Sequence, residues 1–321
     1  MRRALAIAVL VPLAGCGAPA AHLIHRRAPA PAPAPVPAAV PRRPTVVAQR
    51  AALRRLLRIG RPVFCGGRHG RMVALTFDDG PGPYTHLAMK ELRRGGAHGT
   101  FFLVGRVIRR FPGLPRREKA YGALGDHTNT HPFLPGLPAA AARHEIAAGQ
   151  IAAARAAGQA IRLFRPPYGS STPAITRDAR RRGMVEVQWS IDSGDSISGD
   201  FHVIAARVRA AIRPGSIVLM HENRGQTIRA LRSLLPWLRR HHLHAVSVPE
   251  LLAADPPSAA QLGRGENGCP APTPRRPAVR GARASAPRSR AAARRGRRGA
   301  ARPRRRGGRP RPRPARGRAG R

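Results

Sequence analysis

Short apolar runs alternate with longer amphipathic runs between residues 68 and 262, and this pattern restricts the chain to a few folds. The short runs predict buried strands, and the longer runs predict helices that cover them. The expected strands are Met72–Phe77, Thr100–Val104, Met184–Trp189, Ser216–Met220 and Ala245–Val248. The expected helices are 85–94, 139–157, 172–182, 201–213 and 226–240, with Pro236 kinking or ending the last one. Repeated strand–helix units predict a parallel α/β fold, either a barrel or a doubly wound sheet, with its chemistry at the carboxyl ends of the strands.

The acidic residues mark the same region as the folded part of the chain. Of the 15 Asp and Glu residues, 14 lie in 68–262, whereas 1–67 and 270–321 contain none. A net charge of +44 with 34 Gly and 34 Pro is too high for one compact globule of 321 residues, yet 42% hydrophobic residues can supply a core. We therefore expect a folded domain over 67–262 between two unstructured segments, and we exclude a wholly disordered chain.

The first 16 residues have the pattern of an export signal. A basic end, Met1–Arg3, precedes an apolar run, Ala4–Leu13. About ten apolar residues cannot span a bilayer, which needs about 20. The following Leu-Ala-Gly-Cys16 resembles the lipobox of bacterial lipoproteins, so Cys16 is expected to carry a lipid that anchors the protein at the outer face of the cytoplasmic membrane. The alternative is ordinary signal cleavage, which would release a secreted protein and leave Cys16 without a role.

The segments on either side of the domain have compositions that cannot form a core. Residues 17–66 contain alternating Ala and Pro from Ala28 to Pro37, which favours extended conformations and predicts a spacer. Residues 263–321 are rich in Arg and Pro, and we expect them to be disordered. Such a tail could bind anionic wall polymers or could reflect codon bias alone, because 57 of the 59 basic residues are arginine. Nucleic acid is not expected as a partner, since the tail lacks aromatic residues for base stacking.

Two further cysteines, Cys65 and Cys269, lie just outside the two ends of the expected domain. Export to an oxidising compartment permits a disulfide between them. The sequence alone does not decide between a disulfide and two free thiols.

Polar residues follow two of the expected strands directly. Asp78-Asp79-Gly80-Pro81 follows the first strand, and His221-Glu222 follows the fourth. Two adjacent carboxylates repel each other when buried, and a bound cation would remove the conflict. An ordinary Asp-Gly turn with two solvated carboxylates is the alternative.

His127 and His131 strengthen the case for a metal site. Two imidazoles four residues apart can face one ion, and a carboxylate as third ligand leaves positions open for water and substrate. A zinc ion fits this donor set best. A pair of surface histidines is the alternative explanation.

Five ordered motifs now identify a specific resemblance. They are Thr76-Phe77-Asp78-Asp79-Gly80, His127-Thr128-x-x-His131-Pro132, Arg165-Pro166-Pro167-Tyr168-Gly169, Asp192-Ser193-Gly194-Asp195 and Leu219-Met220-His221. Together they resemble the polysaccharide deacetylases with a NodB homology domain, carbohydrate esterase family 4. The resemblance covers about residues 70–250 and implies a distorted (β/α) barrel with a metal site at its C-terminal face.

The resemblance also implies roles for individual residues. Asp79, His127 and His131 match the ligands of a divalent metal, normally zinc. Asp78 matches the general base and His221 the general acid that protonates the leaving amine. The backbone N–H of Tyr168 matches a donor to the developing oxyanion.

Other positions match supporting roles in the family. Arg165 and Asp195 match the residues that position and tune the base and the acid, although an ordinary ion pair would explain them equally well. Leu219 would line the pocket for the acetyl methyl group, or could be plain strand core. Ser196 stands where the family usually has Trp, so an aromatic wall is missing, and Trp189 could replace it in part or belong to the core. We expect activity to survive with an altered substrate fit.

The function implied by these features is metal-dependent removal of acetyl groups from an N-acetylated polysaccharide, with N-acetylglucosamine of peptidoglycan or a related surface glycan as substrate. An O-acetyl esterase of the xylan type would use the same groups. The remaining alternatives are a noncatalytic glycan-binding protein and a polyanion-binding protein that acts through its arginine-rich tail.

Overall fold

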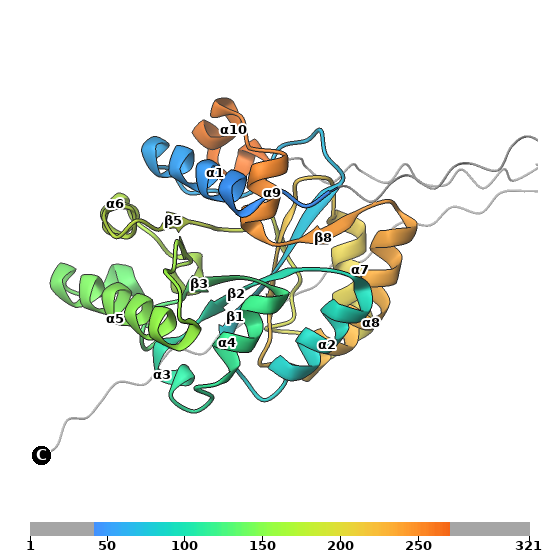
Figure 1. Cartoon of the computed structure of the whole chain (residues 1–321), viewed down its shortest axis with the longest axis horizontal. Coiled ribbons are helices and arrows are strands. Elements are labelled where there is room, and N and C mark those ends of the chain that lie inside the picture. Colours follow the sequence, from blue (N-terminus) through green and yellow to red (C-terminus); the bar gives the residue numbers. More distant parts are fainter. Residues whose placement is uncertain (1–41, 270–321) are drawn as a thin grey trace, which may run out of the picture. The chain divides into compact units, whose positions relative to one another are not determined.

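The computed structural model describes residues 42–269, which form a curled sheet of parallel strands covered by helices (Figure 1). The strands are β1 Met72–Gly80, β2 Gly99–Leu103, β3 Gly122–Asp126, β4 Leu163–Phe164, β5 Val185–Glu186, β6 Ile191–Asp192, β7 Ile217–His221 and β8 His244–Val246. Their order is β5-β4-β3-β2-β1-β7-β6, and β8 pairs with β1 outside this path. The fold is a distorted (β/α) barrel, as expected from the resemblance.

The helices cover the sheet (Figure 1). They are α1 Val46–Ile59, α2 Thr85–Gly95, α3 Gly105–Ile108, α4 Leu114–Glu118, α5 Ala139–Ala157, α6 Pro173–Arg181, α7 Phe201–Ala211, α8 Gly225–Arg240, α9 Val248–Ala254 and α10 Ala259–Arg264. Four short 3₁₀ turns complete the chain: η1 Lys119–Tyr121, η2 Leu134–Gly136, η3 Pro167–Gly169 and η4 Gly265–Gly268. All five sequence-predicted helices are present, and α8 continues through Pro236 to Arg240.

Strand β1 shows how the sequence positions the site. Successive side chains of a strand point to opposite faces of the sheet. Val73, Leu75 and Phe77 belong to the larger apolar cluster, together with residues of α2, α5, α7 and α8. Met72 and Ala74 belong to a second cluster, which also contains residues of α1 and α9. Asp78 continues the alternation of this second face beyond Ala74 and Thr76, so it lies on the inner face at the carboxyl end of the strand.

Helix α1 corrects the predicted spacer, 17–66, at its C-terminal end. Thr45 caps the helix by accepting a hydrogen bond from the Ala48 N–H, and Gly60 ends it with a φ of 68°. Leu53 and Leu56 are buried in the second apolar cluster, which also contains Leu251 and Leu252 of α9. The folded region therefore begins well before residue 67. The part of the predicted spacer before residue 42 lies outside the described residues.

The C-terminal boundary is corrected in the same way. The predicted tail was 263–321, but α10 extends to Arg264 and η4 follows it as far as Gly268. Ser258 and Gln261 form a capping box that starts α10, and Leu262 is buried. Residues 270–321, which hold the rest of the predicted tail, lie outside the described residues.

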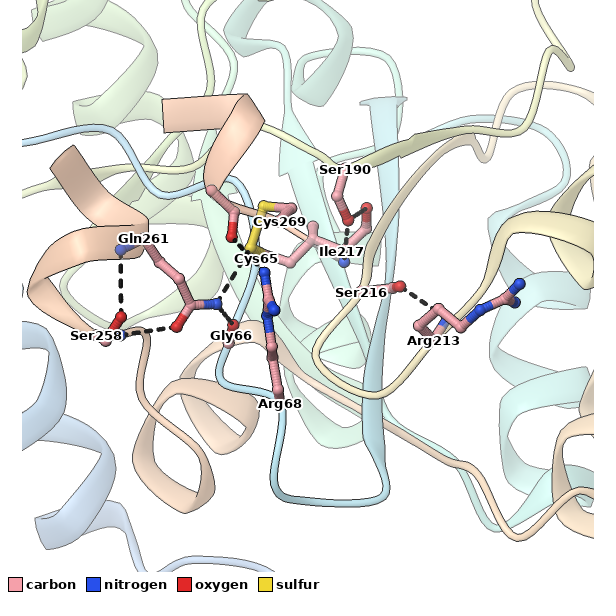
Figure 2. Close-up of a disulfide and its surroundings, with 11 residues drawn as sticks. Cys65, Gly66, Arg68, Ser190, Arg213, Ser216, Ile217, Ser258, Gln261 and Cys269 are labelled. Atoms are coloured by element: carbon pink, nitrogen blue, oxygen red, sulfur yellow. Dashed lines mark hydrogen bonds between the residues drawn. A yellow bond between two sulfur atoms is a disulfide. The ribbon is translucent and has the colours of Figure 1, made fainter. Parts of the chain in front are cut away.

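A disulfide joins the segment between α1 and β1 to the C-terminal end of the folded region (Figure 2). Cys65 and Cys269 are bonded, and their Cα atoms are 5.8 Å apart although 204 positions separate them in the sequence. Beside the disulfide, the Gln261 side chain donates a hydrogen bond of 3.1 Å to the Gly66 carbonyl (Figure 2). The pairing that the sequence left open is thus present in the structure.

None of the helices described within residues 42–269 is both long and apolar enough to cross a membrane. The signal segment 1–16 and Cys16 lie outside the described residues.

Candidate active site

The functional candidates lie at or just beyond the carboxyl ends of strands. Asp78 and Asp79 lie near the end of β1, and Asp78 is in register with His221 at the end of β7. His127 directly follows β3, and Arg165 directly follows β4. Because these strands are parallel, their carboxyl ends meet at one rim of the barrel, as predicted from the sequence.

Asp79, His127 and His131 converge on one point. Asp79 Oδ1 lies 3.2 Å from His131 Nε2 and 3.7 Å from His127 Nε2. Each residue offers one ligand atom, and the three atoms lie within 4.8 Å of one another. This is the arrangement expected of three ligands around a single ion.

Backbone conformation contributes to this convergence. Asp79 has a φ of 67° and His131 a φ of 66°, which is uncommon for residues other than glycine. Thr128, between the two histidines, also has a positive φ, and its Oγ1 accepts a hydrogen bond from the His131 N–H. Backbone conformations of this kind are found preferentially at functional sites.

The protonation of His127 suits a metal ligand. Its Nδ1 lies 2.7 Å from the Arg165 carbonyl oxygen, which leaves Nε2 to face Asp79 and His131. Burial lowers the pKa of His127 to about 3, outweighing the opposing charge of Asp79. At neutral pH its Nε2 therefore carries a free lone pair.

Asp78 is held by a buried guanidinium. Arg165 is fully buried, and its Nη1 donates to Asp78 Oδ1 and to Thr76 Oγ1, both at 2.7 Å. Its other donors reach the carbonyl oxygens of Val187 and Gln188. Burial raises the pKa of Asp78, although the charge and hydrogen bond of Arg165 oppose this. Oδ1 is thus engaged by Arg165, whereas Oδ2 lies 3.6 Å from His127 Nε2.

His221 forms a pair with Asp195 on the other side of Asp78. Its Nδ1 lies 2.7 Å from Asp195 Oδ1, and its backbone N–H donates to Oδ2 at 2.7 Å. Burial alone would lower the pKa of His221, but the Asp195 hydrogen bond and the nearby negative charges raise it to about 8. The imidazole is therefore mostly protonated at neutral pH, with Nε2 as its remaining donor.

The remaining candidates lie in different surroundings. Tyr168 is 65% exposed with a φ of 61°, and its ring meets the His131 ring edge-on with 4.8 Å between centroids. Leu219 is buried on β7. Trp189 is half-buried, and its indole lies so close to Gly169 that any side chain there would collide with it. Ser196 is exposed.

Three polar neighbours of the site were not anticipated from the sequence. Thr227 Oγ1 donates to Asp195 Oδ2, and Asn223 Nδ2 lies 3.5 Å from Asp79 Oδ2. Glu222, noted in the sequence only as the neighbour of His221, is fully buried. Glu222 could have been found from its position, because it is a polar residue close after a predicted strand. Nothing in the sequence singles out Thr227 or Asn223.

Comparison with known proteins agrees with this geometry. The family model described as "Polysaccharide deacetylase" matches residues 66–187. A chitooligosaccharide deacetylase of Bradyrhizobium sp. (strain ANU 289) is 35% identical over 198 residues, which cover 56% of this chain and 90% of the relative.

Solved structures show the same relationship. The Bc1960 peptidoglycan N-acetylglucosamine deacetylase superposes with a TM-score of 0.57 at 31% identity, covering 59% of this chain and 92% of the other. A CE4 family pseudoenzyme from Bacillus anthracis also gives a TM-score of 0.57, at 28% identity, covering 60% of this chain and 68% of the other. Similarity in fold is thus shared with active and inactive proteins alike, so the individual side chains must distinguish between them.

Proposed function

The chain belongs to the polysaccharide deacetylase family, and from this premise we propose that it is a zinc-dependent hydrolase that removes acetyl groups from N-acetylglucosamine in peptidoglycan or a related cell-surface glycan. One observation supports this most directly. The Asp79, His127 and His131 ligand atoms face one another, while Asp78 and His221 occupy neighbouring positions on β1 and β7.

The donor set fits a divalent ion. One carboxylate and two imidazoles are the ligands of an open catalytic zinc site, and the carbonyl of Arg165 already orients His127. When bound, the ion would polarise the acetyl carbonyl and make a water molecule more acidic.

The protein's own groups supply the proton transfers. Asp78 Oδ2 would accept a proton from the attacking water, since Arg165 already holds Oδ1. His221 Nε2 would donate a proton to the departing sugar nitrogen, which leaves poorly as an anion. The Tyr168 backbone N–H would donate to the carbonyl oxygen as it gains charge. Arg165 and Asp195 position the base and the acid, and Leu219 and Trp189 are proposed to contact the substrate.

Both proton-transfer groups are present, which favours an enzyme over a noncatalytic glycan-binding protein. The decisive experiment measures acetate release by the zinc-loaded protein from N-acetylated chitooligosaccharides, peptidoglycan and acetylated xylan. Release from the first two supports the proposal, whereas release from xylan alone supports the O-acetyl esterase. No release from any of them would leave a binding function.

Removing one metal ligand is expected to weaken zinc binding roughly 100-fold or more, since disturbing even outer-shell partners costs 10–100-fold. His131→Ala suits this test because His131 is partly exposed and its removal leaves no buried cavity. Calorimetric titration with zinc measures the affinity. His144→Ala is the control: His144 is exposed on α5, and its loss should leave zinc affinity unchanged.

The fall of kcat/KM at alkaline pH, the alkaline limb of the pH profile, should reflect the loss of the proton from His221. Its acid form is lost as the pH rises through about 8, so kcat/KM is expected to fall above that value. In Asp195→Asn the hydrogen-bonded charge that raises this pKa is gone and burial prevails, so the limb should move down by about one unit or more. Asp192→Asn changes an exposed carboxylate on the neighbouring strand and should leave the limb in place. An unmoved limb in Asp195→Asn would remove His221 as the acid.

We also propose that the protein is exported and anchored by a lipid on Cys16. The disulfide supports export, because such bonds persist in oxidising compartments. The arginine-rich tail is proposed to contact anionic wall polymers. Deleting 270–321 should then reduce activity on wall-bound substrate and spare it on soluble oligomers.

A further inference from the structure

Two buried glutamates, Glu118 and Glu222, are neighbours in the fold. Glu118, the last residue of α4, and Glu222, which follows β7, are both 0% exposed. Each affects the pKa of the other through a side-chain hydrogen bond between the two carboxyl groups. The chain contains only 15 acidic residues in all, so burying two of them together is unusual for its composition.

The pair lacks donors if both carboxyls are ionised. Thr85 Oγ1 donates to Glu222 Oε2 at 2.5 Å, but Glu222 Oε1 and both carboxylate oxygens of Glu118 find no donor among residues 42–269. Within the same residues, no lysine, arginine or histidine forms an ion pair with either glutamate. The nearby charges, Asp78 and Asp79, are negative as well. Two bare carboxylates in such a place would be strongly unfavourable.

A single proton removes the conflict. With a proton on one carboxyl, that group becomes a donor and the other its acceptor. Burial, followed by the charge and hydrogen bond of Glu222, raises the pKa of Glu118 well above its usual value. Burial also raises the pKa of Glu222, to about 7. Because Glu222 Oε2 already accepts a hydrogen bond from Thr85, whereas neither Glu118 oxygen has a donor among residues 42–269, the proton is placed on Glu118 and Glu222 is its acceptor.

Glu222 connects several parts of the site. Its backbone N–H donates to the Asp78 carbonyl at 3.3 Å, and it directly follows His221. Its Oε1 lies so close to Gly80 that any side chain at that position would collide with it. Thr85 Oγ1, besides donating to Glu222, accepts a hydrogen bond from the Gly82 N–H. The Glu222 side chain thus joins the end of β7 to the loop that follows Asp79.

We propose that Glu118 and Glu222 share one proton, and that this pair is a positioning device that holds the loop 79–85 and the end of β7 in register. This inference rests on the proposed function, since it concerns how Asp79 and His221 keep their places. Glu118 forms no hydrogen bond or ion pair with either residue within 42–269, and it acts through Glu222.

Infrared difference spectra at pH 7 test the shared proton without any assay of activity. Replacing Glu118 with Gln should remove the carbonyl band of a protonated carboxyl. Glu91→Gln is the control: Glu91 is also buried but pairs with Arg94 and Arg232, so its replacement should remove a carboxylate band. Loss of a carboxylate band from Glu118→Gln would overturn the proposal and indicate an ionised pair that holds a cation.

Two substitutions at Glu118 test the positioning role. In Glu118→Gln the amide can still donate to Glu222, so kcat and zinc affinity should stay within about twofold of wild type. Glu118→Leu keeps the volume but removes the donor, and we expect kcat and zinc affinity to fall about tenfold, with KM little changed. Equal values in the two variants would overturn the positioning role.

Stability provides a further readout. A carboxyl that stays protonated only in the folded state makes the protein less stable as the pH rises. The urea midpoint of wild type should therefore fall between pH 5 and pH 9 more steeply than that of Glu118→Gln. Parallel curves would contradict the shared proton. If wild type released no acetate, the proposed function would fail, whereas the infrared, zinc and urea results would still decide this inference.

Discussion

Replacing Asp78 with Asn is expected to lower kcat about 10³-fold while zinc still binds. An amide cannot accept the proton of the attacking water, and general-base catalysis typically contributes 10²–10⁴-fold. Zinc binding should persist because the ligand atoms belong to Asp79, His127 and His131. Acetate release under single-turnover conditions measures the effect, and zinc titration of the same variant measures the metal.

The same substitution should also destabilise the protein. Asp78 and Arg165 are both buried, and Asn leaves the guanidinium without a compensating charge. Breaking a buried ion pair in this way typically costs about 3–5 kcal/mol. Kinetics must therefore be measured well below the unfolding transition, which urea denaturation locates.

Asp79→Asn serves as the comparison, because it should lose zinc as well as activity. If Asp78→Asn turned over at the wild-type rate, Asp78 could not be the base. If it lost zinc together with activity, Asp78 would instead be part of the metal site.

The rim of the barrel was predictable because the relevant signals are local. The apolar runs of β1 and β7 are long enough to read as strands, and Asp78, Asp79 and His221 lie at their ends. His127 and His131 lie within one loop, so their spacing is visible in the sequence. Parallel pairing then brings these loops together without further information.

What the sequence did not predict depends on tertiary contacts or on very short elements. Strands β4 and β6 contain only two residues each, too few for a periodic pattern. Helix α1 lies in the segment that its Ala-Pro composition marks as a spacer, although Leu53 and Leu56 lie one turn apart and are buried. Strand β3 was not expected because two of its five residues are glycine.

Glu118 illustrates the limit most clearly. It lies in a segment with three basic neighbours, Arg116, Arg117 and Lys119, which reads as a solvent-exposed turn. Its burial follows from the packing of α4 against α5 and β3 and from the partner, Glu222, that the fold places beside it. No pattern within either segment predicts that pairing.

Removing the disulfide is expected to lower the free energy of unfolding by about 4 kcal/mol. The bond closes a loop between positions 204 apart, and closing so long a loop in the unfolded chain restricts its conformations strongly. For a domain of this size the loss corresponds to roughly 10 °C in Tm. Urea and thermal unfolding of Cys65→Ser/Cys269→Ser, beside oxidised wild type, measure it.

The folded structure itself should change little in this variant. The C-terminal segment remains attached because Gln261 donates to Gly66 and Asp255 accepts from the N–H groups of His69 and Gly70. Cys65 precedes β1, and the seven residues from Met72 to Asp78 alone span about 20 Å of strand. The disulfide is therefore far from Asp78, and turnover by the variant below its Tm should match wild type.

Chemical reduction of wild type tests the effect of losing the disulfide bond without replacing the cysteine side chains. Wild type treated with reductant should unfold like Cys65→Ser/Cys269→Ser, and the variant should not respond to reductant. If oxidised wild type had two reactive thiols and the stability of the variant, the bond would not form in solution. The disulfide would then no longer be an argument for export. The metal site would be unaffected, because it contains no cysteine.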